Sequence, residues 1–186
     1  MQLVQPPASL SLEDFLTRPE TKPATEYING VMTQKPMPKG KHSQLTLLLC
    51  NAINDVAKAR RLGYALPELR CTFDGRSIIP DIAAFRWERI PFDDDGEIPD
   101  DFLSYPDWII EILSPDQRPN PVIEKIAHCL EQGAELGWLI DPSDRSVLIF
   151  QNQSNPKVCR GDAPLIVLSG LELTLTANEL FGWLKL

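Results

Sequence analysis

The chain has 186 residues, of which 43% are hydrophobic and 24% are charged, and its formal net charge is −8. This length and composition indicate a single folded domain over residues 1–186 and argue against a disordered or collagen-like chain. The negative charge argues against a protein that coats or scans DNA, because such binding neutralises phosphates with Lys and Arg. A local basic groove is still compatible with it.

Three further features restrict the setting of the protein. The four cysteines lie far apart with no C-x-x-C pair, which argues against a zinc ribbon and favours a reducing, cytoplasmic environment. Residues 1–10 lack the basic and apolar regions of a signal peptide, so we expect a loose N-terminal leader there. No apolar run approaches the roughly 20 residues of a membrane span, so no membrane association is expected.

The first half of the chain predicts helices on either side of a hairpin. Residues 11–18 predict a short helix, and residues 24–36 predict a hairpin that turns at Asn29-Gly30. A long helix is expected over about 41–61, because its apolar residues recur at intervals of three and four. Gly63 is expected to end that helix.

The second half predicts mainly strands. Two strands are expected over 64–73 and 77–87, followed by an acidic loop over 91–105. The remaining expected elements are an apolar strand over 106–115, a helix over 121–135, strands over 137–142 and 146–152, and a final short helix over 175–186. This order predicts a mixed α/β domain with a central sheet and flanking helices.

Two carboxylates interrupt apolar strands. Glu111 stands within Trp-Ile-Ile-Glu-Ile-Leu, a strand that is apolar on both faces and therefore expected at the centre of the sheet. Asp81 interrupts a second apolar segment, directly after Pro80. Burying an unpaired carboxylate costs roughly several kcal/mol of desolvation free energy. The cost is smaller if a positive group lies nearby or if the carboxylate binds a proton. Together the two acids could hold a divalent cation such as Mg²⁺, or Mn²⁺, through oxygen ligands.

Lys125 lies in the helix that follows the Glu111 strand, beside the apolar stripe of that helix. If the helix packs back onto the sheet, the ammonium group would reach the strand ends, where it could orient a water or stabilise a developing oxyanion. The alternative is a structural ion pair between these acids and the lysine, or a carboxylate that caps backbone amides at a strand tip.

Two further residues are weaker candidates for the same site. Glu26 precedes the Asn29-Gly30 turn and could reach the site from the N-terminal side. His42 stands at the start of the long helix and could contact a phosphate or a metal-bound water. For each of them the alternative is an ordinary surface position with a local hydrogen bond.

In an ordered set of motifs the chain resembles the Uma-two family of candidate endonucleases, in the PD-(D/E)xK superfamily. The motifs are Glu26-Tyr27-Ile28-Asn29-Gly30, His42, Ile79-Pro80-Asp81-Ile82, Ile110-Glu111-Ile112-Leu113-Ser114-Pro115, Lys125 and Gly137-Trp138-Leu139-Ile140-Asp141-Pro142. The resemblance covers roughly residues 11–180. It implies a restriction-endonuclease-like fold, DNA as the substrate and, often, a homodimer.

The resemblance also implies roles for the residues. Asp81 and Glu111 would be metal ligands and Lys125 would be the basic residue of the site. Glu26 and His42 would be supporting positions. Two positions depart from the pattern. The superfamily has a lysine where this chain has Leu113, and similar members often have an aromatic residue where this chain has Cys129.

The resulting hypothesis is metal-assisted hydrolysis of DNA phosphodiester bonds at Asp81, Glu111 and Lys125. One alternative is a catalytically inactive binding or dimeric interaction module that keeps the fold, which the net charge and Leu113 favour. Another is hydrolysis of a different phosphate ester. Metal titration separates the first two, because a cation that binds only the folded chain raises its melting temperature.

Overall fold

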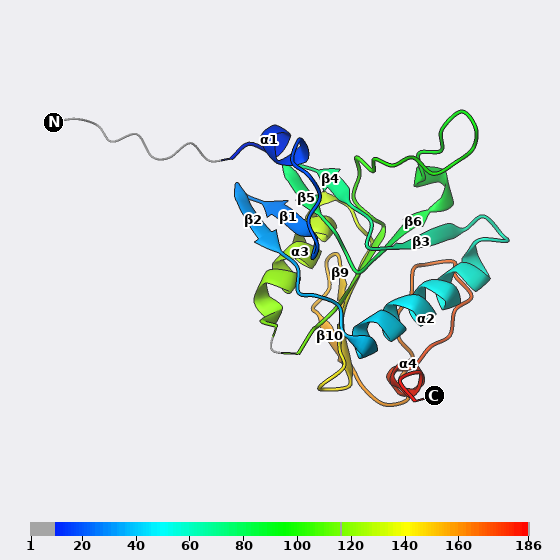
Figure 1. Ribbon diagram of the computed structural model, residues 1–186. Helices are drawn as coiled ribbons and strands as arrows, with labels where there is room; N and C mark the ends of the chain where they lie inside the picture. The colour runs from blue at the N-terminus through cyan, green and yellow to red at the C-terminus, as the bar shows by residue number, and fades with distance from the viewer. Residues whose placement is uncertain (1–9, 116, 186) are drawn as a thin grey trace.

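The computed structural model describes residues 10–115 and 117–185 (Figure 1). Its helices are α1 (Leu12–Leu16), α2 (Gly40–Ala57), the 3-10 helix η1 (Trp87–Arg89), α3 (Pro119–Gln132) and α4 (Ala177–Gly182). Its strands are β1 (Thr25–Ile28), β2 (Val31–Gln34), β3 (Gly63–Pro67), β4 (Cys71–Phe73), β5 (Arg76–Ile78), β6 (Ile82–Arg86), β7 (Trp108–Ile112), β8 (Leu136–Asp141), β9 (Ser146–Gln151) and β10 (Lys157–Cys159). Most of the expected leader, residues 1–9, lies outside the described residues.

The strands form two sheets, where the sequence predicted one central sheet. A four-stranded sheet has the order β2-β1-β5-β4, and a six-stranded sheet has the order β10-β9-β8-β7-β6-β3. In the larger sheet β7 and β8 are parallel and α3 connects them, whereas the neighbouring pairs are antiparallel. The mixed α/β class with flanking helices is confirmed.

The N-terminal elements follow the sequence closely. Ser11 caps α1, because its hydroxyl accepts a hydrogen bond from the Asp14 amide at 3.0 Å. The predicted hairpin is β1–β2, and its turn places both Asn29 and Gly30 at positive φ. This is the conformation for which Asn-Gly is favoured in a two-residue hairpin turn.

The long helix ends earlier than expected. α2 stops at Ala57, and a turn follows in which the Leu62 amide donates to the Ala57 carbonyl. Gly63 does not end the helix but begins β3. A Cβ at this position would lie 2.6 Å from the Phe85 carbonyl oxygen of β6, so the close approach of these two strands requires glycine.

Each of the two strands expected over 64–73 and 77–87 is divided in the structure. The first is broken after Pro67, where Glu68 has a φ of 47°. The second is broken around Pro80, which has no amide hydrogen to donate to a sheet. At both breaks the chain passes between the two sheets, which the apolar pattern alone did not reveal.

The later elements agree better with the sequence. β7, β8 and β9 lie where they were expected, and the acidic loop is exposed over most of its length. α3 begins at Pro119 and ends at Gln132, before Gly133 in the left-handed conformation. The short strand β10 was not predicted. The short final helix is confirmed as α4.

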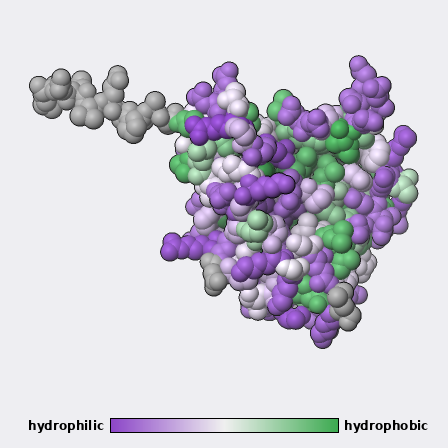
Figure 2. Space-filling model, in the orientation of Figure 1, coloured by the Kyte–Doolittle hydropathy of each residue, from purple (hydrophilic) through white to green (hydrophobic). Residues whose placement is uncertain are grey.

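Both faces of the six-stranded sheet are covered. α2, α4 and the C-terminal segment pack on one face, and α3 packs on the other (Figure 1). Along β7, Ile110 faces the first cluster and Ile109 the second, so this strand is buried on both sides. Hydrophilic residues cover most of the surface shown in Figure 2, with hydrophobic residues in smaller patches between them. Among the described helices, none is long and apolar enough to cross a membrane.

Candidate active site

The two predicted acids lie side by side because of the pairing of β6 with β7. Ile82 of β6 is opposite Ile110 of β7 in an antiparallel pair. Asp81 and Glu111 are the next residues along the two strands, so they meet at one end of this pair. Glu111 points toward the side covered by α3, where it meets Lys125, whereas Asp81 lies at the strand end within reach of His42 of α2. The two acids are 2% (Asp81) and 3% (Glu111) exposed.

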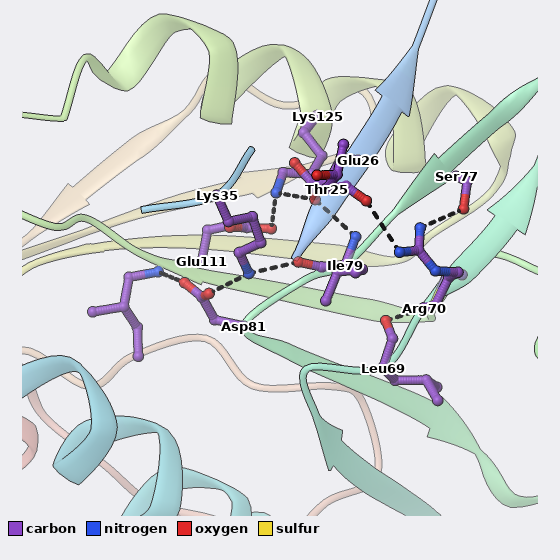
Figure 3. A network of polar contacts seen from close by, with 12 residues as sticks. Thr25, Glu26, Lys35, Leu69, Arg70, Ser77, Ile79, Asp81, Glu111 and Lys125 are labelled. Atoms are coloured by element: carbon purple, nitrogen blue, oxygen red, sulfur yellow. Dashed lines mark hydrogen bonds and ion pairs between the residues drawn. The ribbon is translucent and has the colours of Figure 1, made fainter. Parts of the chain in front are cut away.

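Lys125 reaches these acids from α3. The crossover between parallel strands β7 and β8 lays this helix against the sheet, with Val122 and Ile126 buried on its inner face. Lys125 stands next to that apolar stripe. Its Nζ lies 2.9 Å from Glu111 Oε1 and 2.8 Å from Glu26 Oε1 (Figure 3). The helix thus brings an ammonium group to the two carboxylates Glu26 and Glu111.

Glu26 joins the site from the smaller sheet. It lies in β1 and is 5% exposed. Its Oε1 accepts hydrogen bonds from Lys125 Nζ and, at 2.7 Å, from the Ile79 amide in the connection between β5 and β6. One carboxylate therefore links the hairpin, the connection between β5 and β6, and α3, which fixes the position of the lysine.

Asp81 is fully supplied with hydrogen-bond donors. Its Oδ1 accepts from Lys35 Nζ at 2.7 Å, and its Oδ2 accepts from the Ile112 amide at 2.7 Å and lies 3.0 Å from His42 Nε2. Burial by itself would raise the pKa of Asp81, but the hydrogen bond from His42 and the charge of Lys35 outweigh it and hold this pKa well below its usual range. The side chain is therefore an ionised carboxylate.

Glu111 has a contrasting environment. Burial raises the pKa of Glu111 to about 7, although the neighbouring Lys125 charge favours its ionised form. Its buried Oε1 lies 2.9 Å from Lys125 Nζ, as an ion pair, and meets no other donor among the residues that the structure describes. The same acids act on the lysine: burial would lower the pKa of Lys125, but Glu111 and Glu26 raise it above its usual value.

His42 lies in the first turn of α2 and is 7% exposed. It reaches Asp81 through Nε2, whereas its buried Nδ1 has no hydrogen-bond partner within the described part of the chain. All five residues predicted from the sequence, namely Glu26, His42, Asp81, Glu111 and Lys125, thus belong to one cluster.

Sequence reasoning missed a sixth member, Lys35. It follows the last residue of β2, and its ammonium group donates to both Asp81 Oδ1 and the Ile79 carbonyl at 2.7 Å (Figure 3). No local pattern marks this position, because Lys35 lies in a polar segment between a hairpin and a proline, and its partner is 46 residues away.

The cluster borders a pocket of about 270 Å³. Beyond the six site residues, its polar lining includes Thr33 and Gln34 at the end of β2, and Ser114, Gln117 and Arg118 between β7 and α3. A larger pocket of about 520 Å³ lies beside α1 and contains none of the site residues. The pocket at the cluster is therefore the one that matches the chemistry.

The donor set fits a hard divalent cation. Asp81 offers an ionised carboxylate and Glu111 a carboxylate whose Oε1 contacts only the Lys125 ammonium among the described residues, and oxygen ligands suit Mg²⁺ or Mn²⁺. Among the described residues, no three His, Cys, Asp or Glu side chains are grouped closely enough to hold a metal by themselves. Such a cation would therefore take its remaining ligands from water and phosphate, as Mg²⁺ commonly does.

Comparison with known proteins supplies independent information. The sequence matches the Uma2 family model, described as "Putative restriction endonuclease", over residues 12–178. It is similar to a solved structure whose title is "Crystal structure of a putative nuclease belonging to DUF820 from Anabaena variabilis ATCC 29413", with 48% identity and a TM-score of 0.91, over 94% of this chain and 98% of that one. No curated protein matches the sequence. The expected fold class is confirmed, and the range matched by the family model includes all six clustered residues.

Proposed function

The chain belongs to the Uma2 family, and on that premise we propose that it is a metal-dependent endonuclease that hydrolyses phosphodiester bonds of DNA. A nuclease-type protein is what the family and the similar nuclease structure support. The metal, the DNA substrate and the roles of individual residues are the proposal.

One observation carries the proposal. Two carboxylates from adjacent core strands and a lysine from the crossover helix converge at a pocket, although each group is 5% exposed or less. Burying three charged groups in this way is costly, and a sheet of this kind can be stabilised equally well by apolar residues at the same positions. The arrangement therefore supports a chemical role better than a purely structural one.

The residues of the chain divide the work. Asp81 and Glu111 would hold the cation. When bound, a divalent cation supplies Lewis acidity, which makes water more acidic and offsets the charge on phosphate. Lys125 stays protonated between Glu26 and Glu111, so its ammonium group can donate to a phosphate oxygen whose negative charge grows during the reaction. Glu26 positions that ammonium through its second contact with the Ile79 amide.

The decisive experiment compares cleavage of DNA by the wild-type chain and by Asp81→Ala with and without Mg²⁺. We expect cleavage only with Mg²⁺ and a loss of roughly a hundredfold or more in the variant. Asp107→Ala is the matched control, because Asp107 is a buried carboxylate at the opposite end of the β6–β7 pair and binds Arg89, outside the site. Equal activity of wild type and Asp81→Ala would contradict the proposal.

A second candidate function is a binding or interaction module that keeps the nuclease fold without cleavage. The observation that favours it is that both oxygens of Asp81 already accept hydrogen bonds from the protein. The two functions differ in a simple measurement. If the chain is a metal-dependent nuclease, Mg²⁺ or Mn²⁺ should raise its melting temperature, because the cation binds the folded chain. If it is a binding module, neither cation should change the melting temperature.

We also propose that the whole chain acts as one domain, as a homodimer in the cytoplasm. The dimer rests on the family resemblance, and light scattering of the purified chain tests it. The cytoplasmic setting is supported by the cysteines, since all four are free and buried.

A further inference from the structure

The two acids at the centre of the site are not equally available to a cation. Glu111 Oε1 contacts one group among the described residues, the Lys125 ammonium at 2.9 Å, whereas both oxygens of Asp81 are bound, by three protein donors in all. On Asp81 Oδ2 the donors are the Ile112 amide, which is part of the central strand, and His42 in the first turn of α2. On Oδ1 the donor is Lys35. Any cation that binds Asp81 must therefore replace one of these groups.

Lys35 is the donor that can leave at the lowest cost. The Ile112 amide is fixed by β7, and the His42 ring is held in a buried position. Lys35 instead reaches Asp81 through a flexible four-carbon side chain that comes from the pocket wall, and this side chain is 13% exposed. Its backbone is anchored separately, because its amide donates to the Ala24 carbonyl at 2.8 Å. The ammonium group can thus move without unfolding the hairpin.

The charges of the cluster also favour Lys35 as the group that a cation displaces. The cluster combines three carboxylates, Glu26, Asp81 and Glu111, with two lysines, Lys35 and Lys125. The positive charge of Lys35 is what compensates Asp81, since Lys125 contacts Glu26 and Glu111 instead. A divalent cation beside Asp81 would repel this ammonium group and take over its role.

We propose that Lys35 is a placeholder for the cation: its ammonium group occupies Asp81 in the metal-free chain, and a divalent cation binds by displacing it. This inference rests on the proposed metal-dependent function. It implies that Lys35 stabilises the metal-free fold and lowers the affinity for the cation. After displacement, the ammonium group remains in the pocket, whose lining also includes Arg118, and there it meets an incoming phosphate.

The test is a Mn²⁺ titration of the metal-free chain by calorimetry, with no DNA present. In Lys35→Met the side chain keeps its length and loses its charge. We expect this variant to bind Mn²⁺ at least about tenfold more tightly than wild type, since it removes the competing group. Without metal, its melting temperature should fall by roughly 5 °C, because Asp81 loses a partner.

Lys39→Met is the matched control. Lys39 is exposed, lies four residues further along the same segment and donates no side-chain hydrogen bond to a described residue. It removes the same charge, so an effect of net charge alone would appear in both variants. We expect Lys39→Met to stay within about twofold of the wild-type affinity, since an exposed charge is screened by salt.

The outcomes separate the two proposals. If wild type binds Mn²⁺ and Lys35→Met binds no more tightly, the placeholder role is wrong and the metal site stands. If neither binds Mn²⁺, the proposed metal dependence fails, and the placeholder role fails with it. Tighter binding by both lysine variants would also contradict the placeholder role. Should Lys35→Met not fold, Lys35→Gln replaces it with the same expected direction, because its amide can still donate to the Ile79 carbonyl.

Discussion

The two faces of strand β7 differ sharply, although both are buried. On the α2 side, Trp108, Ile110 and Ile112 pack into a cluster made of apolar side chains, in which the Trp108 and Trp138 rings meet edge to face with centroids 4.8 Å apart. On the α3 side, Ile109 belongs to an apolar cluster, but Glu111 faces Lys125 and the pocket. Alternate residues of one strand therefore serve two different purposes.

The two faces of β7 make opposite contributions to stability: the apolar α2 side stabilises the fold, and the buried Glu111 on the α3 side destabilises it. Burial of an apolar side chain contributes about 1.5–3 kcal/mol relative to exposure. Burial of a carboxylate is unfavourable, and the raised pKa of Glu111 reports that its surroundings compensate the charge only in part. With Glu111 between two isoleucines, the strand is less stable at this position than it would be with an apolar residue. Such locally unfavourable residues are expected at functional sites.

The largest effect should come from the apolar face. Ile110→Ala removes a fully buried side chain opposite Ile82 and beside Trp138, so it should lower the free energy of unfolding by about 2–5 kcal/mol. Glu111→Gln, one residue away, should lower it little or raise it at pH 7, because burial already disfavours the charged form of Glu111 and Lys125 keeps Glu26 as a partner. Denaturant unfolding of both variants measures the contrast.

Leu47→Ala serves as the control for this comparison. Leu47 lies in α2 and is 60% exposed, so the same kind of truncation should change stability by less than about 0.5 kcal/mol. If Ile110→Ala cost no more than Leu47→Ala, the α2 side of β7 would not be the stabilising face.

The same contrast explains how much could be predicted. β7 was predictable because a short apolar run between Pro106 and Pro115 is typical of a buried strand. Glu111 was conspicuous because it is the one charged residue within that strand. Lys125 could be placed because helical periodicity puts it beside the stripe of Val122 and Ile126. In each case the signal is local, and it lies within one strand or one helix.

What could not be predicted depends on contacts between distant segments. The apolar pattern of residues 77–87 reads as one strand, yet the chain leaves the small sheet at Ile78 and enters the large sheet at Ile82. Asp81 is at the site because of that passage. Lys35 reaches Asp81 only after the hairpin has paired with β5, so no spacing within its own segment indicates a role.

A second, somewhat smaller effect should appear in the dependence of stability on pH. The pKa of Glu111 is about 7 in the folded chain against an ordinary value of 4.5. Between these values the folded chain keeps the proton that the unfolded chain has lost, so wild-type stability should fall as pH rises, by about 3 kcal/mol in all, and level off above pH 7. Below pH 4.5 the contribution is fully present. Urea unfolding from pH 4.5 to 8 measures this slope.

Glu111→Gln is the control for the pH dependence, because glutamine does not titrate. The stability of this variant relative to wild type should increase from pH 4.5 to 7 and stay constant above it. Asp81 cannot mimic the effect, because its pKa is lowered and its contribution is lost only as the pH falls below the ordinary range of a carboxylate. Parallel curves for wild type and Glu111→Gln would show that Glu111 is ionised throughout.

The smallest effect tests how α3 is held over the charged face. Gly137 of β8 pairs with Ile109 of β7, and a Cβ there would lie 2.3 Å from Ile126 Cγ2 of α3. Gly137→Ala should therefore push the helix from the sheet and lower stability by about 1–3 kcal/mol. Ile126→Ala removes the obstructing methyl group, so the alanine at 137 should cost less in that background, and a double-mutant cycle measures the difference. Additive costs would show that the close approach at Gly137 does not hold the helix in place. Coupling would show that the contact between Gly137 and Ile126 helps to hold α3, which carries Lys125, against the sheet.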